Sequence, residues 1–294
     1  MFPRFRRILP LYYLIVFLIT LMVHWFLADF LWKNNNRYSL ASLCLVTNQL
    51  VIHDQADYFN QFAAGPSSIN AYLHLWSLSL ELQFYLFVPF LFFGMKFLKS
   101  SYLKLTTVIL ITIIGFVAFA LINAPFAFNF MFLRLWQFSA GFCALFWSKI
   151  RSKKLPTKEQ SDEKCTVPLE EKEIVTVSLC ILAVCLVPRQ LEVLVLRPLV
   201  TFLTTVIIAL EAPNVQLWKS ETLAYIGDIS YVLYLMHWPI ITIFLDYTTK
   251  SYIFCICKSQ ILFTTTVTTT AIILIASILL HHLFEKQYLK LEIP

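Results

Sequence analysis

Residues 4–30 read RFRRILPLYYLIVFLITLMVHWFLADF, a basic head followed by a near-continuous apolar run from Leu11 to Phe30. A run of about 20 apolar residues is long enough to cross the hydrocarbon core of a bilayer as a helix. It is too long for the core of a signal peptide and contains no Ala-x-Ala-like cleavage site. The stretch therefore predicts a retained transmembrane helix.

The rest of the chain has the same apolar character. Over 294 residues it is 59% hydrophobic and only 14% charged, well above the apolar share of a soluble domain. Apolar windows predict about eight spans, and hence an all-α polytopic transmembrane helix bundle. The windows are 8–30, 80–97, 105–123, 130–148, 174–188, 196–210, 229–246 and 260–282.

The basic residues indicate an orientation. The net charge is +6, but these residues lie beside apolar spans, which favours membrane topology over nucleic-acid binding as their explanation. Most of the 23 Lys and Arg residues lie on the cytosolic side if both termini face the cytosol. Residues 149–173 are then a cytosolic loop, and 31–79 face the other side, with Tyr38–Ile52 as a re-entrant piece or packed helix. The sequence does not distinguish plasma membrane from endoplasmic reticulum.

Cysteine and histidine spacing predicts no metal centre. The seven cysteines include no C-x-x-C pair, so neither a zinc site nor a disulfide scaffold is indicated. The pattern His281-His282-x-x-Glu285 resembles metal-ligand spacing, but no third ligand is near it in the sequence.

Residues 74–85, HLWSLSLELQFY, place polar groups at the opening of a long apolar run. An ionised side chain at bilayer depth costs roughly 2.5–3.5 kcal/mol, so it indicates a partner, a cavity or a substrate. In a helix, His74, Ser77 and Glu81 would share one face, while another face would carry the remaining polar or aromatic groups. That second face consists of Trp76, Ser79 and Gln83. This segment is the first candidate for a functional site.

The basic head holds Arg4, Arg6 and Arg7. Guanidinium groups at the mouth of a helix can bind the phosphates of a donor nucleotide or a lipid head group through bidentate bonds. The alternative is a simple topology anchor, which charge alone favours.

Residues 226–239, IGDISYVLYLMHWP, again place a histidine in an apolar helix. A lone histidine such as His237 is more commonly a packing residue. Together with Ser230, Tyr231 and Tyr234, however, it forms a polar stripe suited to lining a cavity.

Residues 133–141, LRLWQFSAG, bring another charge to the entrance of a span. Arg134 is a plausible counter-ion for Glu81, and the alternative is that it snorkels to the interface. Gly141 would permit a close helix contact.

Taken together, these segments resemble the acyltransferase 3 family of integral membrane O-acyltransferases. Its motifs are R-x-x-R, H-x-W-S-L-x-x-E-x-Q-F-Y, an R-x-W-E-x-x-x-G-like segment and I-G-x-I-S-Y-x-L-Y-L-x-H-W-P. Here they read as Arg4 and Arg7; His74, Trp76, Ser77, Leu78, Glu81, Gln83, Phe84 and Tyr85; Arg134, Trp136 and Gly141; and residues 226–239. The match covers nearly the whole chain in order. It departs from the family at Leu82 and Gln137, where many members have Glu.

The resemblance implies transfer of an acyl group from acyl-CoA, at the cytosolic face, to a hydroxyl group of a sugar or lipid on the other side. Acyl-CoA would be a co-substrate, with no further cofactor, and membrane lipid would surround the protein. Arg4 and Arg7 would hold the donor's phosphates, and His74 and Glu81 would be catalytic. The expected cavity-lining residues are Trp76, Ser77, Gln83, Tyr85, Arg134, Ser230, Tyr231, Tyr234 and His237.

Members of the family carry two helices ahead of R-x-x-R, with an Arg followed eleven positions later by a His thought to be the catalytic base. No Arg in this chain is followed by a His at that spacing. The expectation is therefore a single acyltransferase 3-like membrane domain over 1–294 without those two helices. His74 would then replace the base, with Glu81 orienting it. A Ser77–His74–Glu81 triad on one helix is the weaker hypothesis.

Two other functions fit the same residues. A catalytically inactive, truncated relative would bind acyl donors, lipids or a partner without turnover. A secondary transporter would also place polar groups at span entrances, but the sequence has no repeat symmetry, which transporter folds usually show.

Overall fold

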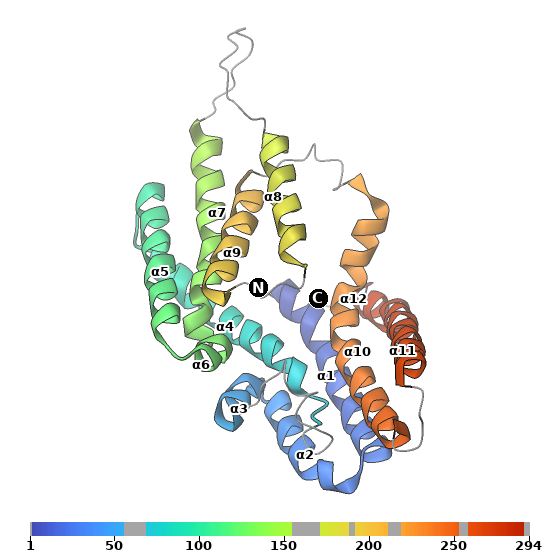
Figure 1. Ribbon diagram of the computed structural model, residues 1–294. Helices are drawn as coiled ribbons and strands as arrows, with labels where there is room; N and C mark the ends of the chain where they lie inside the picture. Colours follow the sequence, from blue (N-terminus) through green and yellow to red (C-terminus); the bar gives the residue numbers. More distant parts are fainter. Residues whose placement is uncertain are drawn as a thin grey trace. The chain divides into compact units, whose positions relative to one another are not determined.

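The computed structural model describes residues 2–55, 69–154, 171–187, 192–210, 219–252 and 258–290 (Figure 1). Within these ranges every regular element is helical and no strand occurs, which confirms the predicted all-α class. The main helices are α1 (Phe2–Phe26), α2 (Asp29–Leu43), α3 (Thr47–Asp54), α4 (Trp76–Lys96), α5 (Ser101–Leu121), α6 (Ala124–Asn129), α7 (Leu135–Lys154), α8 (Glu171–Cys185), α9 (Val193–Leu210), α10 (Glu221–Tyr252), α11 (Lys258–Leu280) and α12 (Lys286–Lys290). Short 3₁₀ turns cover Leu73–Leu75 and Met131–Arg134, and a π-helical turn covers His281–Glu285.

The chain divides into two compact units. The first unit comprises residues 1–85 and 224–294, and the second comprises residues 86–223. The predicted loop 149–173 lies mostly outside the described residues. Its first residues belong to the end of α7, and its last residues belong to the start of α8.

Six helices among the described residues are long and apolar enough to cross a membrane. They are Arg4–Phe26, Leu73–Lys96, Ser101–Leu121, Val193–Leu210, Glu221–Phe244 and Thr265–Lys290. The windows predicted at 130–148 and 174–188 form α7 and α8, which do not meet these criteria. Helix α8 has only 15 residues, and α7 ends in the basic segment 149–154. The protein is therefore a multi-pass membrane protein.

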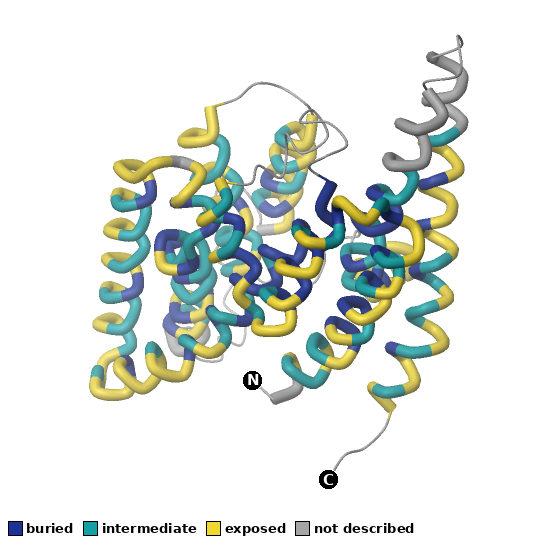
Figure 2. Tube along the Cα trace, turned by 90° about the horizontal axis from the view of Figure 1, so that it is seen from below, coloured by how far each residue is buried: buried dark blue, intermediate teal, exposed yellow. Residues whose placement is uncertain are grey.

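Large apolar residues are exposed on these helices. Figure 2 colours exposed residues yellow, and they recur along the helices. On α5, Ile113 and Ile114 are 54% and 66% exposed, and on α9, Phe202 is 65% exposed. A soluble protein rarely leaves so many large apolar groups in water, whereas lipid tails solvate them without cost.

In the first unit, the predicted span 8–30 is divided. Helix α1 ends at Phe26, and α2 begins at Asp29 after Ala28, which is extended (φ −68°, ψ 148°). Helix α2 packs against α1, because the Tyr12 hydroxyl donates to the carbonyl oxygen of Ser42 at 2.9 Å. The apolar segment Tyr38–Ile52 thus forms parts of two short helices, α2 and α3.

A buried asparagine fixes the chain ahead of α4. Asn35 on α2 is fully buried, and its Nδ2 donates to the carbonyl oxygen of Ile69 at 3.1 Å. Its Oδ1 accepts from the backbone N–H of Ala71 at 2.9 Å. Farther along, Gln83 Nε2 donates to Asn48 Oδ1 at 2.8 Å and to the carbonyl oxygen of Leu45 at 3.0 Å. These bonds position the 3₁₀ turn that carries His74 and the first half of α4.

The second unit is built on the packing of α5, α7, α8 and α9. A close helix contact lies at Gly115 on α5, where an added Cβ would be 3.0 Å from Trp136 Cβ. The expected close contact at Gly141 is not found, since a Cβ there would meet no atom of the structure within 4 Å. The small residue that allows close packing is therefore on α5 and not on α7.

Candidate functional site

The basic head is part of α1, and its side chains leave the helix in different directions. Arg4 Nη1 donates to the hydroxyl oxygen of Tyr85 on α4 at 3.0 Å, and its guanidinium carbon lies 5.6 Å from the centre of that ring. The Tyr85 hydroxyl in turn donates to Glu81 Oε1. Glu81 is thus linked to the arginine end of α1 through a single tyrosine hydroxyl.

Arg6 has no such arrangement. Its Nε and Nη2 atoms are buried, and neither has a hydrogen-bond partner among the residues that the structure describes. This edge of a guanidinium binds carboxylates and phosphates bidentately. Buried donor atoms without a bonded acceptor are costly, so Arg6 is a group that an anionic ligand would stabilise.

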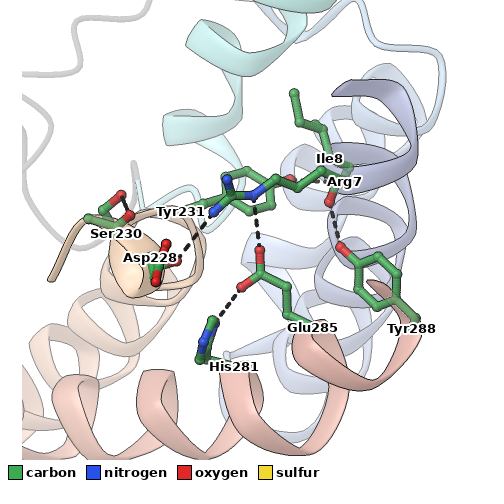
Figure 3. Close-up of polar contacts among 9 residues, drawn as sticks. Arg7, Ile8, Asp228, Ser230, Tyr231, His281, Glu285 and Tyr288 are labelled. Atoms are coloured by element: carbon green, nitrogen blue, oxygen red, sulfur yellow. Dashed lines mark hydrogen bonds and ion pairs between the residues drawn. The ribbon is translucent and has the colours of Figure 1, made fainter. Parts of the chain in front are cut away.

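Arg7 lies among three elements of the first unit (Figure 3). Its Nε is 3.5 Å from Glu285 Oε1, and its Nη2 is 3.5 Å from the carbonyl oxygen of Asp228 on α10. Two tyrosine hydroxyls donate to backbone carbonyls of the same turn of α1, Tyr231 to Ile8 at 2.8 Å and Tyr288 to Arg7. The turn of α1 that contains Arg7 is therefore held by α10 and by residues 285–288, which follow α11.

Glu285 is not among the predicted site residues, because its spacing from His281 resembles only a metal-ligand pattern. The structure places its carboxylate at zero exposure, with Oε2 2.7 Å from His281 Nδ1. Among the described residues, no group of three His, Cys, Asp or Glu side chains could hold a metal. A carboxylate at the end of the last apolar run, opposite an N-terminal arginine, is the signal that sequence reasoning missed.

A second group of polar side chains surrounds His74. The His74 ring lies 5.7 Å from that of His237, 5.9 Å from that of Tyr234 and 6.4 Å from that of Trp238, measured between ring centres. The Tyr234 hydroxyl contacts Ser77 Oγ and donates to the backbone carbonyl of His74. Two motifs far apart in the sequence thus meet in the first unit.

The two histidines of this group differ in their bonding. His74 is fully buried, and the backbone groups of Ala71 and Leu235 lie beside its ring. His237 has its Nδ1 against the carbonyl oxygen of Tyr234. Because a carbonyl only accepts, Nδ1 carries the proton and Nε2 keeps its lone pair. In its neutral form, His237 therefore offers Nε2 as a proton acceptor.

The predicted pairing of His74 with Glu81 is not present. His74 lies in the 3₁₀ turn ahead of α4, so the helical spacing that would align it with Ser77 and Glu81 does not apply. Ser77 faces Tyr234, and Glu81 faces Tyr85. The one-helix triad is absent for the same reason.

The other predicted lining residues are placed as follows. Trp76 is buried at the start of α4, and Gln83 is bonded to α3 and the turn before it. Ser230 is on an exposed side of α10 and donates to the carbonyl of Gly227 in its own helix, as Figure 3 shows. Ser230 therefore does not line the region around Arg7.

Arg134 belongs to the second unit. Its Nε donates to Oε1 of Gln137, the position where many members of the resembled family have Glu, at 2.9 Å. Its guanidinium carbon lies 5.2 Å from the centre of the Phe128 ring, and that of Arg197 lies 4.4 Å from the same ring. The role of Arg134 as a counter-ion for Glu81 stays a prediction.

Fold and site together define a multi-pass helical membrane protein in whose first unit three of the four polar motifs contact one another. The chain belongs to the family described as "Acyltransferase domain", whose model matches residues 1–282. This confirms the resemblance derived from the four motifs.

Curated relatives are O-acetyltransferases. The chain is 28% identical over 258 residues to the peptidoglycan O-acetyltransferase OatA of Listeria monocytogenes, a match covering 82% of this chain and 39% of that protein. It is 27% identical over 259 residues to the putative peptidoglycan O-acetyltransferase YrhL of Bacillus subtilis, covering 82% and 38%. A 53-residue stretch is 45% identical to the O-acetyltransferase OatA of Staphylococcus aureus, covering 18% and 8%. The chain thus spans about two fifths of the length of the first two relatives. No solved structure gives a significant match.

Proposed function

We propose that the protein transfers an acyl group from acyl-CoA to a hydroxyl group on a carbohydrate or lipid acceptor. The observation that carries this proposal is the line from Arg4 through Tyr85 to Glu81, which connects a phosphate-binding type of side chain to the carboxylate of the central motif. The names of the relatives favour an acetyl group and a glycan acceptor.

The donor's phosphates are assigned to the three arginines of α1. Arg7 keeps 47% of its side chain exposed, and Arg6 has buried donors that lack a bonded acceptor among the described residues. Guanidinium groups with open donors suit the diphosphate and the 3′-phosphate of coenzyme A. No further cofactor is proposed.

In the proposed reaction, a base removes the proton of the acceptor hydroxyl, whose oxygen attacks the thioester carbonyl carbon. The C–S bond then breaks, and coenzyme A leaves as a thiolate that takes up a proton. The base is assigned to the His74 and His237 pair. His237 is the member whose Nε2 lone pair is available, and His74 packs beside it.

The proposed orientation has both termini in the cytosol, so that Arg4, Arg6 and Arg7 meet acyl-CoA where it occurs. The 3₁₀ turn with His74 then lies toward the opposite side of the membrane, at the other end of α1 from the arginines. Thr20, on the second half of α1, supports this because its hydroxyl is 2.8 Å from that of Tyr72.

The experiment is reconstitution in lipid vesicles with labelled acetyl-CoA and a soluble glycan acceptor. We expect acetylated glycan from the wild type. We expect a loss of rate of about 10²-fold or more in Glu81→Gln and in His237→Gln, in the range that general acid–base and electrostatic groups contribute. Arg7→Ala should chiefly raise KM for acetyl-CoA.

Unchanged transfer rates in both Glu81→Gln and His237→Gln would contradict the catalytic roles assigned to these two residues. Lys219→Gln, a substitution at an exposed residue, is the control for effects of purification and reconstitution, and its rate should equal that of the wild type. Binding of acetyl-CoA without any transfer by the wild type would support the non-catalytic alternative.

A further inference from the structure

Glu285 is the one fully buried carboxylate among the described residues, and the proposed function does not use it. Its two oxygens have different partners, Arg7 Nε at 3.5 Å and His281 Nδ1 at 2.7 Å. Both partners belong to the first unit, Arg7 at its start and His281 one turn before Glu285. A carboxylate is tolerated inside a protein only where such partners compensate its lost hydration.

The Glu285 contact uses only part of the Arg7 guanidinium. A guanidinium has five N–H donors, of which Nε–H faces Glu285 and one on Nη2 faces the carbonyl oxygen of Asp228. The remaining donors belong to a side chain that is 47% exposed. Figure 3 shows Arg7 lying between these two acceptors, which come from α10 and from the π-helical turn. One edge of the guanidinium is therefore fixed by the protein, and the rest is open to a ligand.

We propose that Glu285, itself held by His281, is a positioning residue that orients Arg7 for the phosphate groups of the donor. This inference rests on the proposed function, because it assumes that Arg7 binds those phosphates. An arginine whose side chain is already ordered loses less freedom when the ligand arrives, which strengthens binding without any new contact to the ligand.

The competing explanation is that Glu285 only joins the end of the chain to α1. Two other bonds already make that connection, since Tyr231 and Tyr288 donate to the backbone carbonyls of Ile8 and Arg7. Neither bond depends on the charge of Glu285. Replacing the carboxylate by an amide of the same shape therefore leaves the connection in place and removes the charge that orients Arg7.

The test measures equilibrium binding of coenzyme A and of pantetheine, which lacks all of the phosphates, to the full chain in lipid nanodiscs. Four proteins are compared: wild type, Glu285→Gln, Arg7→Ala and the double variant. We expect Glu285→Gln to raise Kd for coenzyme A about tenfold, within the range of coupling between contacting residues. Pantetheine binding should not change. In the Arg7→Ala background, Glu285→Gln should have no further effect.

Additive effects of the two substitutions, or an equal loss of pantetheine binding, would overturn the inference in favour of a structural role. Glu221→Gln, the same substitution at an exposed glutamate, is the matched control. If Glu285→Gln does not fold, His281→Asn tests the same point, because it frees Glu285 and should raise the Kd of coenzyme A alone. Failure of the wild type to bind coenzyme A would overturn the proposed function itself, whereas wild-type binding that Glu285→Gln leaves unchanged would overturn only this inference.

Discussion

At the scale of single residues, Asn35, which lies outside the four motifs, fixes the backbone just ahead of the 3₁₀ turn that carries His74. Its amide joins α2 to the backbone on both sides of Asn70, and it is fully buried. The indole of Trp238, next to His237 on α10, donates to the carbonyl oxygen of Asn70 at 2.9 Å. The segment that Asn35 fixes is therefore also bonded to α10. The placement of His74 and His237 side by side therefore depends on a residue outside both motifs.

Asn35→Ala should lower the free energy of unfolding by about 2–3 kcal/mol, because the Ala71 N–H and the Ile69 carbonyl would stay buried without a partner. Thermal unfolding in detergent, followed by circular dichroism, measures this. Asn36→Ala, at the exposed neighbouring asparagine, is the control and should change little. Equal stability of both variants would show that water or a rearranged backbone replaces the two bonds.

At the scale of elements, the second unit depends on how closely α5 approaches the start of α7. Trp136 packs over Gly115 and against Phe116 and Phe119, with ring centres 5.1 and 5.9 Å from its own. The atoms nearest to an added Cβ at Gly115 are the Cβ, N and Cα of Trp136, so the two helix backbones can approach this closely only because Gly115 has no Cβ. The pair is thus the fixed point between these two helices.

Gly115→Ala should lower the free energy of unfolding by about 1–3 kcal/mol, as overpacking against Trp136 forces the helices apart. The same substitution at Gly141, where a Cβ meets no atom within 4 Å, should stabilise the protein by about 0.5–1 kcal/mol through helix propensity. Heat denaturation of the two variants in one detergent compares them directly. Stabilisation by both substitutions would contradict the close contact.

The elements also show what the sequence could and could not predict. Apolar windows locate the long helices, because burial in lipid needs about 20 apolar residues whatever the fold. They miss the break between α1 and α2, because Leu27 and Ala28 are as apolar as their neighbours and the break follows from backbone geometry. Helical spacing aligns His74 with Glu81 only in a regular helix, whereas the backbone makes a 3₁₀ turn before α4. The Arg7 contact with Glu285 joins residues 278 positions apart, which no local pattern reveals.

At the scale of the whole molecule, the first unit is built from both ends of the chain, with the second unit between them in sequence. The bonds of Tyr231 and Tyr288 to the first turns of α1 bring residues near the two termini to the same end of this unit. Because the basic head lies at that end, the positive-inside rule predicts that both termini face the same side of the membrane.

Fusions at the two termini should therefore report the same side of the membrane. We expect a fluorescent protein fused to either end to fluoresce and alkaline phosphatase fused to either end to be inactive, since these reporters distinguish cytosolic from exported sites. A fusion of phosphatase after Asn129 should by contrast be active, because Asn129 follows α5, the third candidate span among the described residues. Phosphatase activity at either terminus would contradict the proposed orientation.

The distance in sequence between Arg7 and Glu285 also has a consequence for biogenesis. Arg7 is translated with α1, whereas Glu285 follows 278 residues later. A ribosome-bound chain therefore carries its arginines into the bilayer interface long before their buried carboxylate exists. In the intermediate, Arg7 lacks this carboxylate partner, and lipid phosphates can take its place until the last helix inserts. Quality-control proteases of the membrane would then be expected to recognise a half-inserted chain by its α1, where Arg7 has not yet met Glu285.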